Sequence, residues 1–126
     1  MNKEKIETFT DLEVWQAGHE LVQKVYTVTS EFPKEEMFGL TSQMRRLAVS
    51  ITSNVAEGFG RSGYGDKVRF YYNAHGSLTE LKNQILVAKD VGYLKKEAIN
   101  NIIDKSQEVH ALLRGLIEKS KEIRDS

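Results

Sequence analysis

The segment QMRRLAVSITSNVAEG, from Gln43 to Gly58, decides the fold, because two different stripes follow helical spacing along it. Side chains three or four positions apart share one face of an α-helix. An apolar stripe predicts a face buried in a core, and its members are Leu40, Met44, Leu47, Ile51 and Val55. A polar stripe runs beside it and consists of Gln43, Arg46, Ser50, Asn54 and Glu57. An ordinary bundle helix needs only the first, so the second predicts specific polar contacts.

Outside this segment, few residues interrupt helical periodicity. One proline and nine glycines occur in 126 residues, and they separate four long amphipathic segments. We expect helices over residues 11 to about 31, from the end of the KEEMFG connector to 58, over 66–91, and from 96 to about 121. Four helices joined by short links predict an all-α fold, an up-down-up-down antiparallel four-helix bundle.

Local signals mark where the helices start and stop. Thr10 and Glu13 match a capping box at the start of the first helix. Pro33 prevents that helix from continuing through Phe32. Gly58 fits a left-handed cap at the end of the second helix, followed by the glycine-rich loop GFGRSGYG.

Length and composition indicate one intracellular domain. We expect a single domain over 1–126, with 1–9 and 122–126 as frayed tails. The chain has no cysteine, which fits a reducing cytoplasm. No apolar run approaches the length of a membrane span, so we expect a soluble cytoplasmic protein without a membrane partner. The 18 basic and 18 acidic residues give a formal net charge of zero, unlike many nucleic-acid binders.

The polar stripe has a matching stripe on the third predicted helix. If the two central helices form an antiparallel hairpin about the glycine-rich loop, polar residues of one lie level with polar residues of the other. The level pairs are Gln43 with Gln84, Arg46 with Glu80, Ser50 with Ser77, Asn54 with Asn73, and Glu57 with Arg69. We predict that they form a hydrogen-bonded ladder that fixes the pairing of the helices. A solvated face, or contact with a neighbouring subunit, would use the same pattern.

Catalytic patterns are missing from the sequence. His19, His75 and His110 lie on three different predicted helices. Neither the Glu-x-x-His pairs of di-iron bundles nor a His-Glu-x-x-His motif occurs, and the glycine-rich loop lacks the lysine of a phosphate loop. We therefore predict no catalytic residue, no cofactor, no metal and no enzymatic activity.

A nucleic-acid contact has some support near the glycine-rich loop. Cations and aromatic side chains can together grip phosphates and stack on bases. The candidate cations are Arg45, Arg61, Lys67 and Arg69, and the aromatics are Phe59, Tyr64, Phe70, Tyr71 and Tyr72. Neighbouring acids and core packing of the aromatics are the alternative interpretation.

A set of motifs resembles a known bacterial family over residues 9 to about 94. The motifs are Phe9-x-Asp11-Leu12-x-Val14-Trp15, Phe32-Pro33, Phe38-Gly39-Leu40, Gln43-x-Arg45-Arg46, Ser50-Ile51-x-Ser53-Asn54-x-Ala56-Glu57-Gly58 and Gly76-Ser77-Leu78-x-Glu80-Leu81. Together they resemble the four-helix-bundle family associated with intervening sequences in 23S ribosomal RNA genes. That family is similar to the accessory protein of diversity-generating retroelements, a basic pentameric bundle that binds nucleic acid and a reverse transcriptase.

The resemblance implies a homopentamer, a ring of bundles around a central channel, and implies no reaction. We therefore expect a non-enzymatic oligomeric protein that presents a surface to a protein or RNA partner. The alternative is an RNA- or DNA-binding module that uses Arg45, Arg61, Lys67 and Arg69 of the assembled ring.

Overall fold

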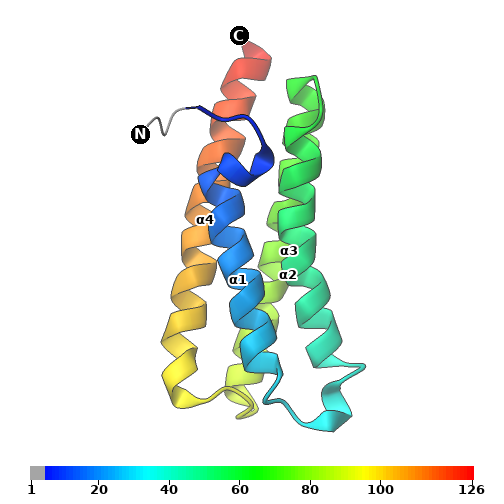
Figure 1. The fold of residues 1–126 in the computed structure, drawn as a ribbon, viewed down its shortest axis with the longest axis vertical. Helices are drawn as coiled ribbons and strands as arrows, with labels where there is room; N and C mark the ends of the chain where they lie inside the picture. The colour runs from blue at the N-terminus through cyan, green and yellow to red at the C-terminus, as the bar shows by residue number, and fades with distance from the viewer. Residues whose placement is uncertain (1–4) are drawn as a thin grey trace.

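A computed structural model of the chain describes residues 5–126. Over this range it contains four α-helices, two short 3-10 turns and no strand. The helices are α1 Glu13–Thr29, α2 Leu40–Phe59, α3 Tyr64–Asp90 and α4 Lys96–Asp125, and the turns are η1 Phe9–Asp11 and η2 Lys34–Glu36. The predicted all-α four-helix bundle is confirmed, with the helices running alternately up and down (Figure 1).

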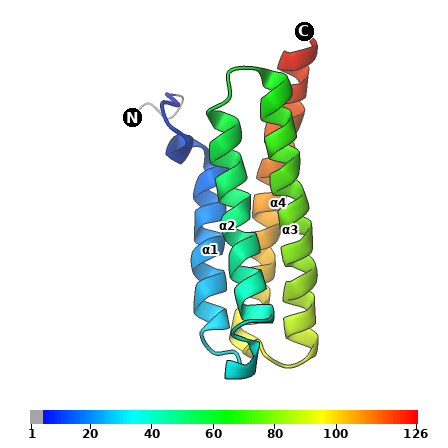
Figure 2. The same ribbon diagram turned by 90° about the vertical axis from the view of Figure 1, so that its right-hand side faces the viewer.

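The helices pack in a closed cycle. Each contacts its neighbours along the chain, and α1 also packs against α4. The α2–α3 turn lies at the same end as the C-terminus, and we call this the turn end (Figure 2). The opposite end holds residues 30–39 and 91–95, and we call it the connection end.

The core follows the predicted apolar stripes. On α2, Met44, Leu47, Ile51 and Val55 are buried, and Leu40 packs against the core from its edge. The buried residues of α3 include Ala74, Leu78, Leu81, Ile85 and Ala88. On α4, helical spacing predicts that Ile123 faces inward, but this side chain is 41% exposed near the end of the helix.

The start of α1 differs from the prediction. The capping box forms two residues earlier than predicted, between Thr8 and Asp11 at η1. The helix α1 then begins at Glu13, with Leu12 as its N-cap residue. The Asp11 carboxylate accepts the N–H groups of Thr8 and Glu7, and these hydrogen bonds lower its pKa. The chain contains two overlapping capping patterns, and the aspartate version competes successfully with the Thr10 pattern.

Gly58 does not cap α2, contrary to the prediction. It lies inside the helix, which continues to Phe59 and ends at Gly60 with a right-handed φ of −76°. A Cβ atom on Gly58 would lie 2.6 Å from Cε1 of Tyr71 on α3. This glycine therefore serves close packing of α2 on α3. In the described part of the chain, only Gly92 adopts a positive φ, at 87°.

The expected C-terminal tail is also wrong, because residues 122–125 belong to α4. At the N-terminus, residues 1–4 of the expected tail lie outside the described residues, and Phe9 belongs to η1. Within residues 5–126, no helix is both long enough and apolar enough to cross a membrane.

Candidate interaction surfaces

Two hydrogen bonds between polar side chains cross the seam between α2 and α3. The hydroxyls of Ser50 and Ser77 lie 2.8 Å apart, and Nε2 of Gln84 donates to Oε1 of Gln43 at 2.9 Å. Asn54 bonds within its own helix, since its Nδ2 donates to the carbonyl and hydroxyl oxygens of Ser50. The expected bond between Asn54 and Asn73 is replaced by this internal one.

The pair expected nearest the turn is wrong. Glu57 accepts from Arg61 at 2.9 Å, and Arg69 donates to Asp66 at 3.4 Å. Each partner lies three or four positions away on the same helix or just beyond its end. Such neighbours already share a helix surface, so they meet more readily than residues on two helices. Glu57 and Arg69 therefore do not pair with each other.

Arg46 and Glu80 lie level with each other and carry opposite charges. Both are exposed, and they sit between the Gln43–Gln84 bond and the Ser50–Ser77 bond. Among the residues described, no carboxylate forms an ion pair with Arg46 and no cation forms one with Glu80. The predicted ladder thus holds two cross-helix bonds and, between them, an unmade charge pair.

The surface around these two charges is otherwise poor in charge. Between Arg46 and Glu57 there is no charged residue, and between Arg69 and Lys89 there are only Glu80 and Lys82. Lys82 is engaged with Nδ1 of His110 on α4 at 2.9 Å. Exposed apolar side chains lie near the pair instead. We define the α2–α3 face as Arg46, Val49, Glu80 and Val87, in which the two apolar residues are 40% and 42% exposed.

At the turn end, the structure gathers three of the four candidate nucleic-acid contacts. Lys67 donates from Nζ to the carbonyl oxygens of Phe59 (2.7 Å) and Gly58 (3.3 Å), at the end of α2. Burial lowers the pKa of Lys67. The guanidinium groups of Arg61 and Arg69 each lie 4.6 Å from the ring centre of Phe70. Each of these cations already has an acceptor from its own chain.

Arg45 does not belong to that cluster. Its Nε donates to the hydroxyl of Thr29 at 2.9 Å, and its guanidinium lies 4.6 Å from the ring centre of Tyr26. These contacts place Arg45 between α1 and α2, more than a dozen residues along α2 from the turn, which is roughly 20 Å at the helical rise. The expectation of one joint contact region is therefore wrong for Arg45.

Comparison with known proteins identifies the family. The model of the 23S rRNA-intervening sequence protein family matches residues 10–115. The chain belongs to this family. Comparison with curated protein sequences gives no significant match. A crystal structure of a protein of unknown function from the S23 ribosomal protein family of Bacteroides thetaiotaomicron has a TM-score of 0.76 at 19% identity. The alignment covers 82% of this chain and 97% of that one, and shows a shared fold.

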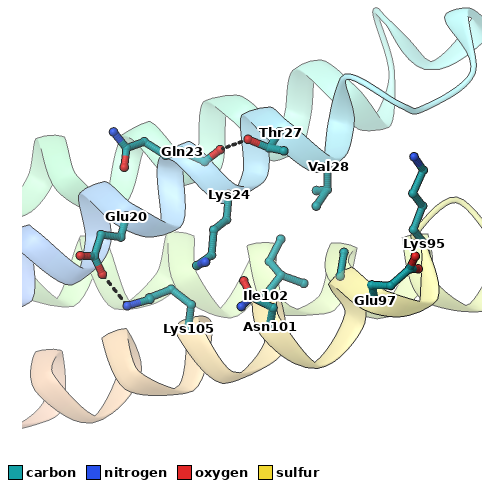
Figure 3. A pocket seen from close by; sticks show the side chains of 11 residues that line it. Glu20, Gln23, Lys24, Thr27, Val28, Lys95, Glu97, Asn101, Ile102 and Lys105 are labelled. Carbon is teal, nitrogen blue, oxygen red and sulfur yellow. Dashed lines mark hydrogen bonds and ion pairs between the residues drawn. The ribbon is translucent and has the colours of Figure 1, made fainter.

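A hollow between α1 and α4 has a volume of about 720 Å³. Figure 3 shows its polar walls, in which Lys105 reaches across to Glu20. Lys105 also pairs with Glu108, and hydrogen bonds to the two acids raise its pKa. Lys95 pairs with Glu31 at 3.3 Å. None of the residues predicted for a site lines this hollow. The ion pair between Lys105 and Glu20 joins α4 to α1.

A smaller hollow of about 440 Å³ was missed by the sequence analysis. It lies between α1 and α2 near the connection end, and we call it the α1–α2 hollow. Its lining residues are Tyr26, Met37, Thr41, Ser42, Arg45, Arg46 and Val49. Beside it, Phe38 is 95% exposed. The signal in the sequence was the pair Met37-Phe38, two large apolar residues in a connector where no core stripe requires them.

The histidines are closer together than their sequence positions suggested. The rings of His75 and His110 lie edge to face with centres 5.1 Å apart, across α3 and α4. Burial lowers the pKa of His110, and the nearby Lys82 adds to the effect. His19 stacks on Trp15 instead. Across residues 5–126, no group of three or more potential ligands could hold a metal ion.

Proposed function

We propose that this protein is a non-enzymatic, cytoplasmic assembly protein whose copies associate into a closed ring. The family resemblance implies five copies, and the ring would present a composite surface to a protein or RNA partner. The observation that carries this proposal is the unmade charge pair of Arg46 and Glu80 on a face that is otherwise poor in charge.

The physical argument begins with charge. An exposed arginine and glutamate that are level on one hairpin, yet unpaired, can each pair with the opposite charge on another copy. Charged residues are depleted at the centres of protein interfaces, and the α2–α3 face has that character, with Val49 and Val87 exposed near the pair. A head-to-tail contact arises if Arg46 of one copy meets Glu80 of the next copy while its own Glu80 meets Arg46 of a third copy. Repeated head-to-tail contacts of this kind generate a ring.

The test is a charge exchange. The wild-type protein should elute as an oligomer in size-exclusion chromatography with light scattering. Arg46→Glu or Glu80→Arg alone places like charges across the interface and should shift the protein towards monomer. The double variant Arg46→Glu/Glu80→Arg recreates the pair in reverse and should recover the oligomer. Lys119→Glu, on the exposed surface of α4, is the matched control and should change nothing.

Two results would overturn this proposal. A wild-type protein that is monomeric at all concentrations removes the assembly itself. An oligomer that is equally insensitive to both single exchanges removes the assigned surface.

A second candidate function is binding of single-stranded RNA or DNA at the turn end. The observation that favours it is the convergence of Arg61, Lys67 and Arg69 on aromatic rings, which a ring of copies would multiply. The internal acceptors of these cations weigh against strong binding. Fluorescence anisotropy with labelled single-stranded RNA tests it. Specific use of this cluster requires binding that weakens steeply with salt and is reduced by Arg61→Gln/Arg69→Gln.

A further inference from the structure

The connection end carries an aromatic side chain that its own chain leaves uncovered. Phe38 is 95% exposed, and its neighbour Met37 is 48% exposed. Such a side chain is the type of residue that dominates protein interfaces when a partner covers it. The almost complete exposure of Phe38 therefore suggests that a specific partner surface covers this side chain.

The segment that carries Phe38 is held firmly. The Glu36 carboxylate accepts the N–H of Leu40 at 3.0 Å and the hydroxyl of Tyr93 at 2.9 Å. These two bonds tie η2 to the start of α2 and to the α3–α4 connection. Because the turn is already ordered, covering Phe38 would lose little conformational entropy, which favours binding.

The α1–α2 hollow has the complementary character. Tyr26 and Val49 are exposed apolar walls, at 44% and 40%. Its volume of about 440 Å³ is ample for a phenyl ring. Arg45 is fixed in it by Thr29 and by the ring of Tyr26, and within residues 5–126 no carboxylate pairs with it.

We infer that Phe38 of one copy inserts into the α1–α2 hollow of the next copy. Glu35 precedes it in the same turn, is exposed, and forms no ion pair among the described residues. It can reach the terminal nitrogens of Arg45 as the ring enters. Arg46 stays available for Glu80, so the two charge pairs do not compete. This inference rests on the proposed self-association and names its anchor.

A second copy is the occupant because every chain carries both halves of the contact. Met37 lines the hollow of its own chain, whereas the adjacent Phe38 is almost wholly exposed and stays outside it. A projecting residue and a receiving hollow on one chain form a head-to-tail contact, which is the type that closes into rings. The acid on the projecting turn and the arginine in the hollow add matching charge.

The experiment separates the two halves. Phe38→Ser removes the anchor and leaves the hollow intact, whereas Ser42→Trp fills the hollow and leaves the anchor intact. Each variant alone should raise the dissociation constant of the assembly by at least about tenfold, as loss of an interface anchor does. Mixed together, the two variants retain one intact anchor and one intact hollow, so they should form a one-to-one heterodimer. Tyr72→Ser, which removes a half-exposed aromatic from α3, is the control.

The outcomes distinguish this inference from the broader proposal. If wild-type protein is monomeric, both are overturned. If it assembles, and both variants assemble with wild-type affinity, the assembly stands and the role of Phe38 is overturned. If the variants lose assembly but their mixture forms no heterodimer, Phe38 and the hollow do not contact each other, and the inference is again overturned. Circular dichroism of each variant confirms that the helices remain folded.

Discussion

At the turn end of the bundle, Lys67 and Arg61 are held by oxygen acceptors of their own chain. Phe38 at the connection end is 95% exposed, and Arg46, near the start of α2, forms no ion pair among the described residues. Both ends combine cations with aromatic side chains. The turn end uses them to close the structure, through the tight approach of Gly58 to Tyr71 and the capping of α2 by Lys67. At the connection end, Phe38 stays exposed.

This difference shows that residue types alone do not locate a binding surface. Three cations beside a glycine-rich loop look like a phosphate contact in the sequence. Once the loop folds, nearby acids and helix-end carbonyls satisfy them. A surface available for binding is one where the chain provides no acceptor, as at Arg46. If the turn end serves stability and the connection end serves assembly, substitutions at the turn end should affect folding and substitutions at the connection end should affect association.

The largest effect on stability is expected at Gly58. Gly58→Ala places a methyl group against the Tyr71 ring, and overpacking of this kind should lower the free energy of unfolding by about 2 kcal/mol. Urea denaturation followed by circular dichroism measures it. Gly76→Ala is the matched control, because a Cβ there meets nothing within 4 Å and better helix propensity should stabilise by about 0.5–1 kcal/mol. Equal effects at both glycines would contradict the packing role of Gly58.

Replacing Lys67 should produce a smaller loss at the same end. Lys67→Met keeps an apolar stem of similar length but removes the hydrogen bonds to the carbonyls of Phe59 and Gly58. Loss of a charged donor at a helix C-terminus should lower the free energy of unfolding by about 1 kcal/mol. Lys119→Met provides the surface control. An unchanged unfolding midpoint for Lys67→Met would show that solvent replaces the ammonium without loss.

The turn end should also respond to alkaline pH. Burial raises the pKa of Tyr71 to about 12, from about 10 in an unfolded chain. The folded state therefore holds this proton more tightly, so its contribution to stability is complete below pH 10 and is lost as pH rises towards 12. Tyr71→Phe should remove this part of the pH dependence. Phenolate absorbance during titration should lose one late-ionising tyrosine in the variant, whereas Tyr93, whose pKa is raised by its hydrogen bond to Glu36, should still ionise late.

The smallest effect on stability is expected at the connection end. Phe38→Ser should leave the free energy of unfolding of the monomer within about 0.5 kcal/mol of wild type, because the side chain buries almost nothing within its chain. Denaturation at dilutions where the protein is monomeric measures this. Substantial destabilisation would mean that Phe38 serves the fold, and the contrast between the ends would then fail.

The sequence was sufficient to predict the fold because one kind of signal dominates it. Residues such as Met44, Ile51 and Leu81 recur at helical spacing, and burying one stripe per helix allows few arrangements. The ends of the helices were less predictable. Thr8 and Thr10 both begin capping patterns, and the choice between them depends on backbone geometry that a sequence does not show. Gly58 was misassigned because close packing and helix termination both favour glycine.

The interaction surfaces were predictable in part. The level arrangement of α2 and α3 follows from the short turn, and it brings Ser50 to Ser77 and Gln43 to Gln84. The ion-pair partners were not predictable, because Glu57 could pair with a cation on either of two helices. In the structure it pairs with Arg61. The α1–α2 hollow depends on how Arg45 folds over Tyr26, a contact between residues of different helices that no spacing rule encodes.

One carboxylate has a further consequence for the way the connection end opens. Glu36 bonds at once to the first amide of α2 and to Tyr93 beyond α3. A fluctuation that releases Glu36 frees both segments together. The amides at the start of α2 and around residue 93 should therefore exchange hydrogen with solvent as one cooperative unit, and assembly should slow that exchange in both segments at the same time.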